Sequence, residues 1–96
     1  MEAAMATLSS SQIDALLQEN PGWRLDSGEL VRDWAFENFV EAMVFVNHVA
    51  GVAEASGHHP DIDIRYNKVR LGLVSHDAGG ITDRDARMVS RLKQLS

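Results

Sequence analysis

The sequence predicts an α+β domain, in which three helices cover one face of a four-stranded antiparallel sheet in the order α-β-β-α-β-β-α. Two observations carry this prediction. Two pairs of alternating apolar segments, each pair joined by a turn signal, are typical of β-hairpins. A long segment with apolar residues at spacings of three and four separates the two pairs and predicts a helix. One sheet covered by helices buries the apolar face of every element.

The first part of the chain predicts a short helix followed by a hairpin. Ser11 and Asp14 resemble a capping signal, so a helix is expected to run from there to about Glu19, where an Asn-Pro-Gly sequence stops it. Residues 23–26 predict a short strand and residues 30–36 a longer alternating strand. The Ser-Gly pair between them is a turn signal.

The second part predicts a long helix, a second hairpin and a last helix. The long helix is expected to begin at Asn38 and to end at Gly57, and its wide apolar surface favours central packing or contact with a second subunit. Residues 62–66 and 69–73 alternate and predict the hairpin. Thr82, with an aspartate three positions later, predicts the cap of the last helix.

Composition limits the class of protein. The chain has 96 residues, which is one domain, and we expect residues 1–8 to be a loose terminus and 9–96 to be the domain. The net charge of −5 argues against binding to a nucleic-acid backbone. Cysteine is absent, which excludes disulfides and thiolate sites. No apolar run approaches the ~20 residues of a membrane span. The first residues resemble neither a secretory signal nor a transit peptide, so a cytoplasmic location is expected.

Three histidines are the strongest candidates for chemistry. His58 and His59 stand before Pro60, just ahead of the second hairpin, and His76 follows that hairpin. The outer ends of an antiparallel hairpin lie side by side, so the three imidazoles are expected to converge. Imidazole exchanges protons near neutral pH, and the cluster therefore predicts proton transfer.

Other interpretations of the same residues remain open. Three histidines could hold zinc, but adjacent residues on an extended segment point apart, which disfavours one shared ion. Ser75 is not positioned to act as a nucleophile with its neighbour His76. Asp85 is better explained as a capping residue of the last helix, whereas Glu54 is explained equally well as a solvated surface carboxylate and as a partner that orients a histidine. His48 lies mid-helix and is expected to be partly exposed or interfacial.

The spacing of the candidate residues resembles that of the pterin-4a-carbinolamine dehydratase family. The resemblance extends over nearly the whole chain and includes the segments 66–69 and 75–80. It implies dehydration of 4a-hydroxytetrahydropterin to quinonoid dihydropterin in the recycling of tetrahydrobiopterin, with no metal or organic cofactor. The pattern that carries it is Glu54-x3-His58-His59-Pro60-x5-Tyr66-x9-His76-x8-Asp85.

The resemblance also implies roles for individual residues. His58, His59 and His76 match the catalytic histidines of the family, and Asp85 a supporting carboxylate. The residues expected to contact the pterin are Glu54, Gly57, Pro60, Val74, Ser75 and Asp77.

The family resemblance further implies partners. Members form homodimers or homotetramers, and animal members also act as a dimerisation cofactor of a transcription factor, which implies a nuclear role in those cases. A dimerisation module without catalysis is therefore the alternative function. Many members have a polar residue at the position of Gly57 and an aromatic residue at that of Ile62. These departures affect the pocket and leave the histidines intact.

Overall fold

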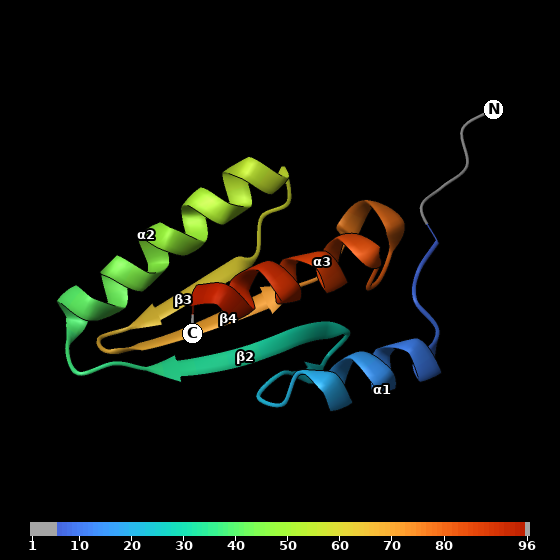
Figure 1. Cartoon of the computed structure of the whole chain (residues 1–96), viewed down its shortest axis with the longest axis horizontal. Coiled ribbons are helices and arrows are strands. Elements are labelled where there is room, and N and C mark those ends of the chain that lie inside the picture. The colour runs from blue at the N-terminus through green and yellow to red at the C-terminus, as the bar shows by residue number, and fades with distance from the viewer. Residues whose placement is uncertain (1–5, 96) are drawn as a thin grey trace.

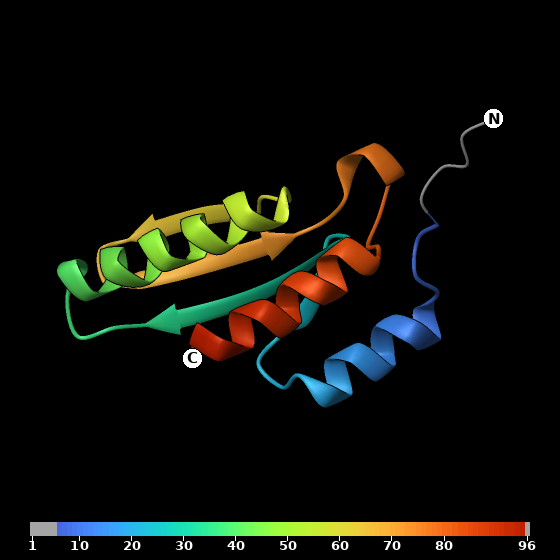
Figure 2. The same cartoon turned by 45° about the horizontal axis from the view of Figure 1, so that its top comes forward.

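The computed structural model describes residues 6–95 and contains one antiparallel sheet with strand order β1-β2-β4-β3 (Figures 1 and 2). The order of helices and strands confirms the predicted α-β-β-α-β-β-α arrangement. The elements are α1 (Ser10–Glu19), β1 (Arg24–Asp26), β2 (Glu29–Ala35), α2 (Phe39–Ser56), β3 (Asp61–Arg65), β4 (Lys68–Leu73), η1 (His76–Ala78), α3 (Asp83–Leu92) and η2 (Lys93–Leu95).

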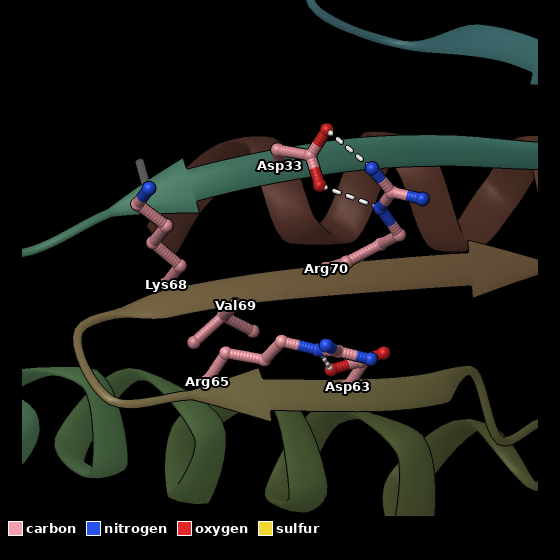
Figure 3. Close-up of a pocket in the computed structure, with 6 residues that line it drawn as sticks. All are labelled: Asp33, Asp63, Arg65, Lys68, Val69 and Arg70. Carbon is pink, nitrogen blue, oxygen red and sulfur yellow. Dashed lines mark hydrogen bonds and ion pairs between the residues drawn. The ribbon is translucent and has the colours of Figure 1, made fainter.

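The two faces of the sheet differ in chemistry. The register pairs Leu30 with Leu73 and Trp34 with Val69, so these side chains share the face that the helices cover. Charged side chains alternate with them and lie on the uncovered face, in front of the helices in Figure 3. The helix-covered face carries the core, which consists of Trp23, Leu30, Ala42, Phe45, Val46, Val49, Val69, Leu71, Leu73, Ile81, Met88, Val89 and Leu92.

Both hairpins form, with one difference in position. Ser27 and Gly28 have φ of 52° and 83°, as the first predicted turn requires. The second turn lies one residue earlier than the sequence suggested, because β3 and β4 pair Arg65 with Lys68. That register keeps the isoleucines of β3 beside Val69 and Leu71 of the core, and it places Tyr66 in the turn with φ of 54°.

The start of α1 corrects the expected cap. Ser9 is the N-cap: its hydroxyl accepts from the Gln12 backbone, and the Gln12 side chain accepts from the backbone N–H of Ser9. Ser11 lies inside the helix, because the reciprocal pair three residues apart, Ser9 and Gln12, begins two residues earlier. The expected loose segment 1–8 lies partly outside the described residues. Within its described part, Leu8 donates its N–H to Ile81 O at 2.8 Å.

Among residues 6–95, no helix combines the length and the apolar character that crossing a bilayer requires.

Candidate functional site

The end of α2 positions the two adjacent histidines. Gly57 ends the helix in the left-handed conformation, with φ of 66°, a conformation that glycine adopts without strain. The chain then runs extended through His58 and His59 to the buried Pro60. The two imidazoles therefore point apart, as expected: His58 is 9% exposed and lies under α3, while His59 faces solvent.

His58 is bound to a fully buried carboxylate. Its Nε2 lies 2.6 Å from Asp85 Oδ1, and the Asp85 side chain is completely shielded from solvent. The other oxygen, Oδ2, accepts from the Ser75 hydroxyl and from the Thr82 backbone N–H, both at 2.9 Å. Asp85 also closes the predicted capping box of α3. The carboxylate thus ties the end of α2, the end of β4 and the start of α3 together.

The direction of these hydrogen bonds determines the tautomer of His58. An ionised carboxylate only accepts, so His58 Nε2 must carry a proton that it donates to Asp85. Ser75 gives its hydroxyl proton to Asp85, and Thr82 therefore donates to Ser75 Oγ at 2.7 Å. The Arg84 N–H in turn donates to Thr82 Oγ1. Each of these donors around Asp85 has an acceptor, and Nδ1 is the nitrogen of His58 that does not bind the carboxylate.

His59 has a carboxylate partner of a different kind. Its Nε2 lies 2.5 Å from Glu54 Oε2, one helical turn earlier on α2, and both side chains are largely exposed. Solvent weakens an exposed pair of this type, so the contact orients the ring more than it stabilises the fold.

The end of β4 lies beside the start of β3, because the antiparallel register pairs Asp61 with Gly72, and His76 follows β4 by three residues. It begins η1, a 3-10 helix, and its side chain is exposed. The structure does not join it to the other two histidines by a hydrogen bond within residues 6–95. Its neighbour Asp77 accepts from Arg84 at 2.5 Å, which holds the pKa of that carboxyl below its usual value.

The remaining candidate residues differ in accessibility. Gly57 is exposed, Val74 is half-buried and Pro60 is buried. Ser75 is 1% exposed, and its hydroxyl is occupied by the Asp85 network. Sequence reasoning missed the roles of Thr82 and Arg84 in this network. The capping motif at Thr82 was the available signal, but it could not show that the same carboxylate reaches back to a histidine.

The uncovered face of the sheet has a separate hollow of about 320 Å³ (Figure 3). Asp33 accepts hydrogen bonds from Arg70 Nε at 2.7 Å and from Arg24 at 3.0 Å. The negative charge of this lining residue is therefore paired with two arginines. The hydrogen bond from Arg70 lowers the pKa of Asp33. None of the histidines lines this hollow. Its lining consists of Asp33, Asp63, Arg65, Lys68, Val69 and Arg70.

Comparison with known proteins places the chain in a family. The model of the pterin 4 alpha carbinolamine dehydratase family matches residues 6–95. The chain belongs to this family. It is 53% identical over 92 residues to a protein of Thermomicrobium roseum, with 96% of this chain and 99% of that protein covered. It is 52% identical over 91 residues to one of Acidobacterium capsulatum, with 95% and 99% covered. Both are provisionally named pterin-4-alpha-carbinolamine dehydratase.

Solved structures agree with this membership. A transcriptional coactivator/pterin dehydratase from Brucella melitensis superposes with a TM-score of 0.88 at 27% identity, covering 94% of this chain and 98% of that one. A pterin dehydratase-like protein identified as a RuBisCO assembly factor in the alpha-carboxysome superposes with a TM-score of 0.64 at 22% identity, covering 77% and 88%. The second likeness shows a shared fold alone.

Proposed function

We propose that this protein dehydrates 4a-hydroxytetrahydropterin to quinonoid dihydropterin and water, as the names of its relatives suggest for them. The observation that carries the proposal is the buried His58–Asp85 pair beside the exposed His59–Glu54 pair, in a chain of this family. Recycling of tetrahydrobiopterin is the proposed context, in the cytoplasm.

The chemistry requires one proton to be given and one to be taken. The C4a hydroxyl leaves as water only when an acid protonates it, and a base must accept the N5 proton. Imidazoles suit both tasks near neutral pH, and each such group typically contributes 10²–10⁴-fold. In the proposal, His58 accepts through Nδ1, because its other nitrogen donates to Asp85. His76 supplies the proton for the leaving hydroxyl, and His59 binds the pterin or serves the opposite C4a stereoisomer.

The pterin is proposed to lie between the α2–β3 link and the β4–α3 loop. Glu54, Gly57 and Pro60 would border it on one side, and Val74 and Asp77 on the other. Because the Ser75 hydroxyl is buried and occupied, Ser75 would contact the pterin through its backbone alone. The proposed reaction uses no metal or organic cofactor.

Stopped-flow absorbance of freshly generated 4a-hydroxytetrahydropterin tests the proposal. We expect the wild-type protein to accelerate formation of the quinonoid product and the His58→Ala/His76→Ala variant to lose the acceleration. His48→Ala is the matched control, because His48 is an exposed histidine of α2. A folded wild-type protein that leaves the spontaneous rate unchanged would refute the proposal.

A dimerisation module is the second candidate function, and one feature favours it. Phe39, Val40 and Val44 of α2 are 48%, 69% and 52% exposed, an unusual amount of apolar surface for one helix. This surface supports a proposed homodimer or homotetramer. Sedimentation of the wild type and of Val40→Asp/Val44→Asp tests it: a wild type that stays monomeric at all concentrations would exclude this role. A complex with a transcription factor rests on family resemblance alone.

A further inference from the structure

The loop that carries His76 is closed by its own backbone. The Ser75 N–H donates to the Gly80 carbonyl at 3.0 Å, and the Gly80 N–H donates back to the Ser75 carbonyl at 3.3 Å. The N–H of Ala78 also donates to the Ser75 carbonyl, at 3.0 Å. These hydrogen bonds lie within residues 75–80, so they fix the shape of the loop but not its place on the protein.

Two consecutive residues of α3 hold the residues on either side of His76. On one side, Asp85 accepts from the Ser75 hydroxyl at 2.9 Å. On the other, Arg84 donates through Nη2 to Asp77 Oδ1 at 2.5 Å. In the part of the chain that the structure describes, no other side chain of this loop hydrogen-bonds to the rest of the protein. His76 is therefore held through its two neighbours, and both contacts come from the first turn of α3.

The same turn of α3 also holds His58. Asp85 binds His58 Nε2 at 2.6 Å through its second oxygen, and Arg84 is the residue before Asp85. The position of His76 relative to His58 is therefore set by adjacent residues of one helical turn. Loss of the Arg84 contact should free one side of the loop and leave His58 in its buried pair.

The Arg84 side chain is confined, although its partner is largely exposed. It is 28% exposed, whereas the Asp77 side chain is 71% exposed. The Arg84 Nε is buried and has no acceptor within residues 6–95, so Asp77 is the acceptor that orients the guanidinium group. The hydrogen bond from this group lowers the pKa of Asp77, and the pair is therefore ionised at neutral pH.

We propose that Arg84 is a positioning residue: by holding Asp77, it fixes the loop that carries His76 relative to His58. The catalytic part rests on the proposed dehydratase function, in which His76 supplies the proton for the leaving hydroxyl. The anchoring of the loop does not rest on that function. One partly exposed ion pair changes an equilibrium by up to about fivefold, and this range sets the size of the effects expected.

Amide hydrogen exchange of the full-length protein, measured by NMR, tests the anchoring without any activity measurement. Ala78 and Gly79 donate their N–H groups within the loop, and we expect their protection factors to fall about two- to fivefold in Arg84→Met. Asp77→Asn breaks the same contact from the loop side and should give a similar fall. Arg84→Lys keeps a charged donor, so it should restore part of the protection.

Arg87→Met is the matched control. Arg87 lines the same hollow of about 50 Å³ beside His58 as Arg84 does, but it pairs with Asp83 of its own helix at 2.8 Å. The control removes an equal charge from α3 and no contact to the loop, so the loop amides should keep wild-type protection. Equal protection in the wild type, Arg84→Met and Asp77→Asn would overturn the proposal. An equal fall in Arg87→Met would also overturn it, because a general change of charge would then be the cause.

Kinetics test the effect on the reaction. In Arg84→Met we expect kcat to fall about two- to fivefold and KM to stay within about twofold, because the acid is displaced while the other groups around the substrate stay in place. The loss should shrink at about 1 M salt, which screens the wild-type ion pair. Arg84→Met should cause no further loss in an Asp77→Asn background. A purely structural role of the arginine stem would depend on neither salt nor Asp77.

Exchange and kinetics together separate the anchoring of the loop from its effect on the reaction. An active wild type whose kcat is unchanged in Arg84→Met, despite the expected fall in loop protection, would overturn the catalytic part. A wild type without dehydratase activity, combined with the expected protection factors, would refute the proposed function and leave the anchoring by Arg84 established.

Discussion

His58 and Asp85 form a buried hydrogen-bonded pair that joins the end of one helix to the start of another. Their 2.6 Å contact spans 27 positions of the sequence, and the same carboxylate accepts from Ser75 and Thr82. A group proposed for proton transfer is therefore held by the contacts that hold the fold. Variants of this network should therefore lower both the free energy of unfolding and the activity. Variants of the exposed His59–Glu54 pair should lower the activity and leave the free energy of unfolding nearly unchanged.

Asp85→Asn should destabilise the protein by about 3 kcal/mol, because an amide has one accepting oxygen where the two carboxylate oxygens accept three hydrogen bonds, from His58, Ser75 and the Thr82 backbone. Chemical denaturation measures the loss. Asp83→Asn is the control on the same helix: its carboxylate is exposed and pairs with Arg87, so we expect a loss below about 1 kcal/mol. Equal losses in the two variants would contradict the assignment of a buried network.

His58→Ala and His59→Ala should differ in stability but not in activity. Removing His58 leaves a buried carboxylate without its main partner, at a cost of about 2–4 kcal/mol. Removing the exposed His59 should change the free energy of unfolding by less than about 0.5 kcal/mol. Both variants should lose about 10²-fold or more in kcat. Full activity in a folded His59→Ala protein would remove this residue from the proposed machinery.

Ser75→Ala should lower stability by about 1–3 kcal/mol, because a buried hydroxyl that donates to Asp85 is lost. KM for the pterin should stay unchanged, since this side chain does not reach solvent. Ser90→Ala, at an exposed position of α3, controls for the loss of a hydroxyl. A tenfold rise in KM at unchanged stability would instead place the Ser75 hydroxyl on the substrate.

Gly57→Ala should cost about 1 kcal/mol through backbone strain alone, since no atom lies within 4 Å of the added methyl group. Gly57→Asn should cost less, because asparagine tolerates a positive φ. Thermal unfolding ranks the three proteins. If the Gly57→Ala protein were as stable as the wild type, the left-handed conformation at the end of α2 would not require glycine.

Asp33 and Glu29 should contribute to stability with opposite pH dependence. The Asp33 pKa is lowered by the Arg70 hydrogen bond, so its contribution is present above about pH 4 and is lost as pH falls through the folded-state pKa. The Glu29 pKa is raised, so its contribution is full below about pH 4 and is lost as pH rises through the folded-state pKa.

Urea unfolding between about pH 3 and pH 7 measures both effects. The advantage of the wild type over Asp33→Asn should shrink toward acid pH. Relative to Glu29→Gln, which cannot ionise, the wild type should lose stability as pH rises. Parallel curves for the wild type and Glu29→Gln would contradict the raised pKa.

Much of the fold was predictable because it depends on local patterns. Alternation and turn residues located both hairpins, and Asn38 and Gly57 marked the ends of α2, where the Asn38 side chain accepts from Glu41. The errors were also local. The cap of α1 lies at Ser9, and the second turn begins at Tyr66. The cap moved to Ser9 because reciprocal hydrogen bonds with Gln12 form there. The turn moved to Tyr66 because the register of β3 and β4 pairs Arg65 with Lys68. Neither cause can be read from a single residue.

The sequence by itself determined the order of the elements, the family and the residues able to exchange protons, because periodicity, caps and motif spacing are properties of short segments. Only the tertiary structure decided which partner each residue has. It buried His58 against Asp85, left His59 beside Glu54 in solvent, and placed the Glu29 carboxylate over Gly72, whose register partner on β3 is Asp61. Helix packing and strand register set these pairings, and both depend on the whole core rather than on any one segment.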